Sequence, residues 1–135
     1  MLQDYTGVFF LVLLSYAIAF ISPILRNNRK QFVAFLFIIT SLHVVSFINY
    51  FVLTLPGADR DASTLNRHVI SAINQDYSLN FSIGTGLYEH ILYVGYTFLG
   101  ANKLVGQSLS IVVAAISLTV ILEIARYFQI HDRLK

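Results

Sequence analysis

The sequence has no cysteine and few charged residues. Of its 135 residues 12% are charged, against about a quarter in a soluble domain, and 56% are hydrophobic. The lack of cysteine excludes disulfides and thiolate metal sites. With a mean hydropathy of +0.69, this composition predicts an all-α, polytopic membrane protein. Residues 1–135 read as a single membrane domain, with room for three or four spans.

Familiar motifs of soluble enzymes are missing as well. The sequence contains no nucleophile elbow, phosphate-binding glycine loop, zinc-type histidine pair or nucleic-acid-binding motif. A soluble enzyme is therefore not expected, and neither is nucleic acid as a partner. The N-terminus lacks the basic segment and cleavage site of a secretory signal peptide, so the first apolar run is expected to be a mature span.

Three uncharged apolar runs are long enough to cross a hydrocarbon core of about 30 Å. They cover residues 5–25, 32–55 and 104–122. Pro23 falls near the end of the first run, where a kink is tolerated. These runs predict about three transmembrane helices.

Two other segments predict amphipathic helices that lie on the membrane surface. Residues 62–75 repeat apolar side chains at helical spacing, with polar side chains opposite. The apolar stripe is Ala62, Leu65, Val69, Ala72 and Ile73, and the polar side carries Thr64, Arg67, Ser71 and Asn74. Residues 86–100 are apolar but contain Glu89, which would cost about 2.5–3.5 kcal/mol inside hydrocarbon. Their tyrosines are typical of the membrane interface.

The basic residues predict the orientation. Arg26, Arg29 and Lys30 stand between the first two runs, and Arg126, Arg133 and Lys135 follow the last. The positive-inside rule places both groups in the cytoplasm. The N-terminus and the loop 55–102 are then external, with Lys103 as a single charge against this arrangement.

Asp59 and Asp61 are the candidate catalytic residues. They follow the second run, after Pro56 and Gly57 allow the backbone to turn. A carboxylate there can act as a general base on an acceptor hydroxyl, or hold a divalent cation that bridges phosphates. The simpler alternative is a helix cap with ordinary interfacial charge, which is common for an isolated pair.

Five residues are candidates for substrate binding: Arg60, Arg67, His68, Glu89 and Tyr93. The arginines suit phosphate because of their planar fork; contact with lipid headgroups or with Asp61 is the alternative. His68 and His90 are candidates for a proton-transfer pair, because histidine as a residue type titrates near neutrality. Histidine inside a span, as at position 43, more often bonds a neighbouring helix.

Glu89 shares one helix face with Tyr93 and Tyr96, because the spacings are four and seven residues. This face predicts one of two roles. It is either an aromatic contact for a sugar or lipid with an acid among it, or an interfacial tyrosine belt with a snorkelling acid.

The order of these features resembles the amino-terminal part of the C-type integral-membrane glycosyltransferases and the related bacterial polysaccharide polymerases. The resemblance covers residues 54–120. It rests on Asp59 at the start of the external loop, on residues 93–100, and on the GQSLS stretch at 106–110. It implies a polyprenyl-phosphate-linked sugar donor at the bacterial inner (plasma) membrane. It also implies that Asp59 is the catalytic base or a metal-adjacent residue, with Asp61 as its competitor.

Members of that group have more spans, with further acids in later external loops. The resemblance therefore implies that residues 1–135 are the N-terminal portion of a larger domain, completed by other membrane helices and not competent alone. The alternative is a small non-catalytic assembly or lipid-binding subunit. It would pack on a partner through the small residues of the last run: Gly106, Ser108, Ser110, Ala114, Ala115 and Ser117.

Overall fold

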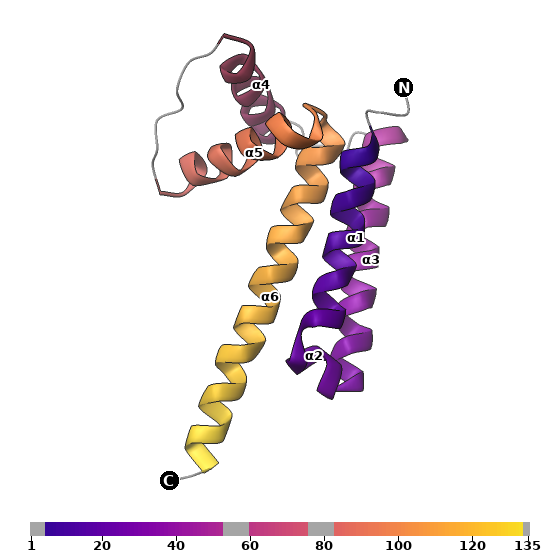
Figure 1. The fold of residues 1–135 in the computed structure, drawn as a ribbon, viewed down its shortest axis with the longest axis vertical. Helices are drawn as coiled ribbons and strands as arrows, with labels where there is room; N and C mark the ends of the chain where they lie inside the picture. The colour runs from indigo at the N-terminus through magenta and orange to yellow at the C-terminus, as the bar shows by residue number, and fades with distance from the viewer. Residues whose placement is uncertain (1–4, 53–59, 76–82, 134–135) are drawn as a thin grey trace.

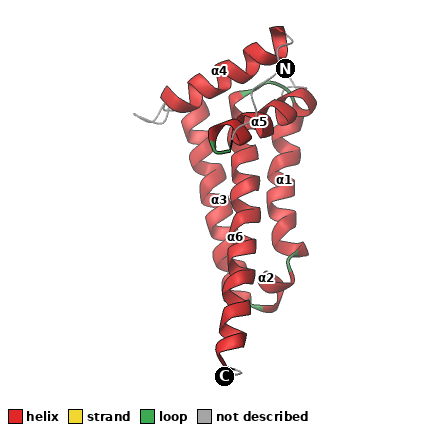
Figure 2. Cartoon of the chain, turned by 90° about the vertical axis from the view of Figure 1, so that its left-hand side faces the viewer, coloured by secondary structure: helices red, strands yellow, loops and turns green. Residues whose placement is uncertain are grey.

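The computed structural model describes residues 5–52, 60–75 and 83–133, and side chains for 5–52, 64–75 and 83–128. Within these ranges the chain folds into six helices without a strand, which confirms the all-α prediction. Three of these helices run side by side as a bundle, and two others lie across one end of them (Figures 1 and 2).

The first predicted span is not one continuous helix. Helix α1 covers Thr6–Ile21, and the short helix α2 covers Pro23–Asn27. Ser22 between them is extended, with ψ of 116°, because the proline ring disfavours the helical region for the residue before it. Proline then starts α2, where its missing N–H group leaves no bond unmade.

Helix α3, Arg29–Phe51, begins inside the basic segment rather than after it. The Asn28 side chain accepts hydrogen bonds from the backbone N–H groups of Lys30 and Gln31 at 3.2 and 3.3 Å. This N-cap satisfies two of the four amides that have no partner within the helix.

Within the part of the chain that the structure describes, two helices are long and apolar enough to cross a membrane, fewer than the three predicted. They are α3 and the Lys103–Phe128 part of α6, which covers Lys103–Arg133. Helix α1 has 16 residues, or about 24 Å of length, short of a hydrocarbon core of about 30 Å. Much of the outer surface is nevertheless apolar: Phe9 on α1, Phe37 on α3 and Ile121 on α6 are 65%, 74% and 60% exposed. Such a surface is typical of a protein that lies in a bilayer.

Polar side chains join the three long helices. The Ser15 hydroxyl on α1 donates to the Val12 carbonyl at 2.7 Å, and its oxygen lies 2.8 Å from Nε2 of His43 on α3. Because the serine proton is used, the Nε2–H group of His43 must be the donor. The expectation that His43 bonds a neighbouring helix is confirmed.

Helices α4, Arg60–Gln75, and α5, Thr85–Leu99, lie across the end of the bundle where α6 begins (Figure 2). The predicted stripe of α4 faces inward: Val69 and Ala72 are fully buried, whereas Thr64, Arg67 and Asn74 are exposed. Val69 packs in one core cluster with residues of α1, α5 and α6. The stripe is therefore covered by protein, and the two helices form a cap on the bundle.

Candidate functional site

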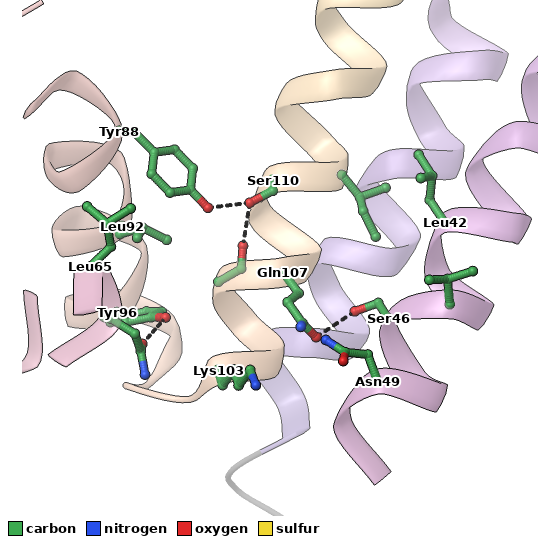
Figure 3. Close-up of a pocket in the computed structure, with 14 residues that line it drawn as sticks. Leu42, Ser46, Asn49, Leu65, Tyr88, Leu92, Tyr96, Lys103, Gln107 and Ser110 are labelled. Carbon is green, nitrogen blue, oxygen red and sulfur yellow. Dashed lines mark hydrogen bonds between the residues drawn. The ribbon is translucent and has the colours of Figure 1, made fainter. Parts of the chain in front are cut away.

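A cavity of about 440 Å³ lies between the cap and the bundle, bounded by α3, α4, α5 and α6. Figure 3 shows its lining. Polar side chains come from all four helices: Ser46, Asn49, Asn66, Tyr88, Tyr96, Lys103, Gln107 and Ser110. Apolar residues such as Leu42, Leu65, Leu92 and Ile111 fill the spaces between them. Most of the surface that the cavity exposes is nevertheless apolar, so it suits a largely apolar molecule that carries a few polar groups.

Hydrogen bonds within the lining hold its polar side chains in place. The Ser46 hydroxyl donates to Oε1 of Gln107 at 2.9 Å, which ties α3 to α6. The Ser110 hydroxyl donates to the Gly106 carbonyl at 2.9 Å, so the Tyr88 hydroxyl must donate to Ser110. These bonds fix the wall while leaving the Gln107 amide nitrogen as a donor group on a positioned side chain.

Tyr96 joins the cap helices. Its side chain is 4% exposed, and its hydroxyl donates to Oδ1 of Asn66 on α4. Burial, together with the neighbouring Tyr88, raises the pKa of Tyr96 to about 12. The phenol therefore stays protonated and keeps its donor role throughout the physiological range.

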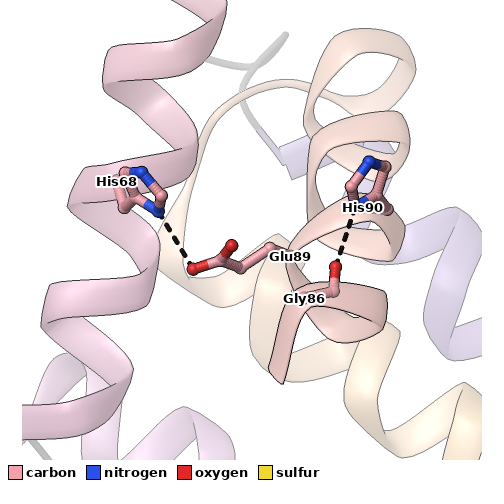
Figure 4. Close-up of polar contacts among 4 residues, drawn as sticks. All are labelled: His68, Gly86, Glu89 and His90. Carbon is pink, nitrogen blue, oxygen red and sulfur yellow. Dashed lines mark hydrogen bonds and ion pairs between the residues drawn. The ribbon is translucent and has the colours of Figure 1, made fainter. Parts of the chain in front are cut away.

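A second link between the cap helices is a contact between His68 and Glu89, which is an ion pair when the imidazole carries its second proton (Figure 4). Nδ1 of His68 on α4 lies 3.0 Å from Oε1 of Glu89 on α5, with the two side chains 48% and 17% exposed. His90 is oriented differently: its Nδ1–H group donates to the Gly86 carbonyl of its own helix at 2.8 Å. His68 and Glu89, predicted separately as substrate contacts, thus contact each other.

The other predicted site residues are not all brought together. Asp59 lies outside the described residues, and Arg60 and Asp61 belong to the first turn of α4 without described side chains. Arg67 is exposed on α4, and Tyr93 packs against the core cluster rather than lining the cavity. Among the side chains that the structure describes, no group of three or more metal-ligating residues occurs, so the predicted metal role of Asp59 or Asp61 stays a prediction.

Ser46 and Asn49, which line the cavity from α3, were not proposed as site residues from the sequence, whereas Gln107 and Ser110 belong to the GQSLS stretch that carries the resemblance. Ser46 and Asn49 are three apart in one apolar run, as are Gln107 and Ser110 in another. Residues three apart share a helix face, and polar residues inside a span usually face the bundle interior. The three-residue spacing of these polar residues is the feature by which they could have been predicted to line a common site.

Comparisons with protein-family models, with curated proteins and with solved structures give no match to this chain. The resemblance to the membrane glycosyltransferases therefore stays a prediction from the sequence motifs.

Proposed function

We propose that this chain is a glycosyltransferase-like membrane protein that acts on polyprenyl-phosphate-linked sugars in the assembly of a cell-surface polysaccharide or glycan. The observation that carries the proposal is the mainly apolar cavity beneath the cap, with polar side chains at one end of it. Lys103 and Asn49 line it near the start of α6 and the end of α3, and Leu42 lies about two turns deeper along α3. A lipid-linked sugar has the same sequence of parts, an anionic head followed by an apolar chain.

The proposed topology has three spans in the inner membrane of a bacterium. Helix α1 packs against both α3 and α6 along the bundle, which supports it as the third span despite its length. Arg26, Arg29 and Lys30 gather at the α2 end, and the positive-inside rule assigns that end to the cytoplasm. The cap and the loop 55–102 then face the outside.

In this proposal Asp59, or Asp61 in its place, is the general base. It takes the proton of an acceptor hydroxyl, the oxygen attacks the anomeric carbon of the donor, and polyprenyl phosphate leaves. A divalent cation held by either aspartate is the alternative way to use these carboxylates. Arg60 and Arg67 would contact phosphate.

His68, Glu89 and Tyr93 have a second proposed part in this arrangement. The ion pair between His68 and Glu89 fixes the cap over the cavity, and Tyr93 packs against the core beneath it. Their contribution to substrate binding would then be to position α4 and α5.

Polymer synthesis in cells tests the proposal. Asp59→Asn should abolish synthesis while the amount of protein in the membrane stays normal, and Asp61→Asn serves as the matched comparison. Gln107→Leu should impair synthesis as well, whereas Ser117→Leu, at an exposed position of the same helix, should not. Full synthesis by the Asp59→Asn variant would remove this residue from the mechanism.

A non-catalytic membrane partner is the second candidate. Of the small residues in α6 that would suit packing on another helix, Ala114 and Ser117 are exposed. Gly106, Ser108 and Ala115 are instead buried within the chain. Fewer small residues of α6 are therefore exposed for packing on a partner helix than the sequence suggests. This favours the proposed enzyme over the non-catalytic partner.

A further inference from the structure

A second polar cavity lies at the opposite end of the bundle from the cap. It measures about 400 Å³ and is bounded by α2, the first turn of α3, and α6. Asn27, Asn28, Gln31 and Arg126 provide its polar lining, and Ile24 and Leu122 belong to its apolar part. Among the side chains that the structure describes, none that lines this cavity is acidic.

The lining offers hydrogen-bond donors. Oδ1 of Asn28 already accepts from the two backbone amides of α3, so the group that Asn28 has left to offer is its amide N–H. Asn27 and Gln31 carry amide groups of the same kind, and Arg126 adds a planar guanidinium. Three amides and one guanidinium suit an oxyanion with several acceptor oxygens, such as a phosphate.

The charge around the cavity has one dominant sign. Arg26, Arg29 and Lys30 lie in α2 and the first turn of α3, beside the residues that line it. Among the described side chains, none of these three forms an ion pair, and neither does Arg126. Glu123, one turn before Arg126, is the one acid among the described side chains of α6. The cavity is thus set in a positive field.

Large apolar side chains continue from the cavity along the outside of the bundle. Ile21, two residues before α2, is 74% exposed, and Ile121, beside Leu122, is 60% exposed. A free anion would make no use of these surfaces. A phospholipid would, because its acyl chains lie beside the headgroup that the polar lining holds.

From these observations we infer that the cavity between α2, α3 and α6 binds the phosphate headgroup of an anionic membrane phospholipid. Basic pockets between transmembrane helices are known sites for such headgroups. The inference does not depend on the proposed glycosyltransferase activity, because it uses a different end of the molecule and different residues.

The test is lipid binding by the purified full chain in non-ionic detergent, followed by native mass spectrometry. Phosphatidylglycerol is the probe, phosphatidylcholine is the zwitterionic comparison, and inorganic phosphate is the competitor. At 0.15 M salt the screening length is about 8 Å, so a charge beside the cavity should contribute less than one that contacts the headgroup directly. Arg126→Gln removes a charge that lines the cavity, and Arg29→Gln removes the same charge beside it. Gln31→Leu removes a donor without changing the charge.

We expect Arg126→Gln to weaken phosphatidylglycerol binding by about tenfold and Gln31→Leu by roughly fivefold, with less than about a twofold change for Arg29→Gln. Circular dichroism shows whether each variant keeps its helices. Equal weakening by the two arginine variants would mean general charge attraction and would overturn the site. If phosphatidylcholine bound as tightly as phosphatidylglycerol, the cavity would not select anionic headgroups, and the inference would be overturned. Displacement by millimolar phosphate would assign the cavity to a free anion instead of a lipid.

Discussion

Nδ1 of His68 and Oε1 of Glu89 lie 3.0 Å apart on two different helices, although the residues are 21 positions apart in the sequence. Each was a separate candidate for substrate contact, and their pairing links α4 to α5 on the outer side of the cap. Tyr96 and Asn66 form the second link nearby, beside the cavity. These two contacts tie α4 to α5, and the buried apolar stripe of α4 and the bond between Tyr88 and Ser110 hold the cap on the bundle.

Glu89→Gln should loosen α4 without unfolding the bundle. Because the pair is partly exposed, it should stabilise the docking of α4 on α5 by about 0.5 kcal/mol. Losing it corresponds to roughly a twofold loss of protection against hydrogen exchange. Hydrogen exchange of the α4 amides measures this loss directly. Arg67→Gln, at an exposed position of α4, should leave exchange unchanged. Unchanged protection in Glu89→Gln would show that the ion pair does not hold the cap.

The proposed topology predicts which positions react with a reagent that cannot cross the membrane. Because the sequence has no cysteine, each introduced cysteine is labelled alone. Arg29→Cys should react from the cytoplasmic side and Asp76→Cys from the outside. Labelling of both from one side would overturn the topology, and labelling of Lys103→Cys from the cytoplasm would make α5 a span.

Strong alkali should weaken the fold through Tyr96. Its pKa is raised from 10.0 to about 12 in the folded chain. Below pH 10 the phenol is protonated in both states and contributes no pH dependence. Between pH 10 and 12 the unfolded chain loses the proton that the folded chain keeps, so stability falls as pH rises, by roughly 2–3 kcal/mol in total. When unfolding in detergent is measured as a function of pH, the stability of Tyr96→Phe should decline less steeply above pH 10 than that of the parent protein.

Helix positions could be predicted from the sequence because they follow local patterns. The stripe of α4 is an example: Val69 and Ala72 were expected on one face, and both are fully buried. The break at Ser22 was underestimated, because a proline near the end of an apolar run is compatible with either a kink or a stop. The outcome depends on whether the chain must turn back, which is a property of the whole bundle.

The cavity could not be predicted in the same way. Ser46 and Gln107 are 61 positions apart and meet because α3 and α6 pack in one particular register. Periodicity shows which side of a helix is polar, but not which residue of another helix lies at the same height. His68 and Glu89 illustrate the same limit, because their pairing depends on how α4 crosses α5.

Gly106 and Tyr96 provide the sharpest test of the cavity wall. A Cβ at position 106 would collide with the Tyr96 hydroxyl, and would come within 3.3 Å of Cδ2 of Leu92. Gly106→Ala must therefore push the phenol away from Asn66, at a cost of about 1–3 kcal/mol. Tyr96→Phe removes the oxygen that the methyl group strikes, so adding Gly106→Ala to that variant should cost much less.

The double-mutant cycle for these two residues, measured by unfolding in detergent, should thus be strongly non-additive. The expected coupling is about 1 kcal/mol or more, with the double variant more stable than the sum of the single changes predicts. Additive effects would mean that the Tyr96 hydroxyl does not lie over Gly106, and the cavity lining would need a different arrangement. Because the cycle measures stability and not synthesis, its outcome is independent of the proposed enzymatic role.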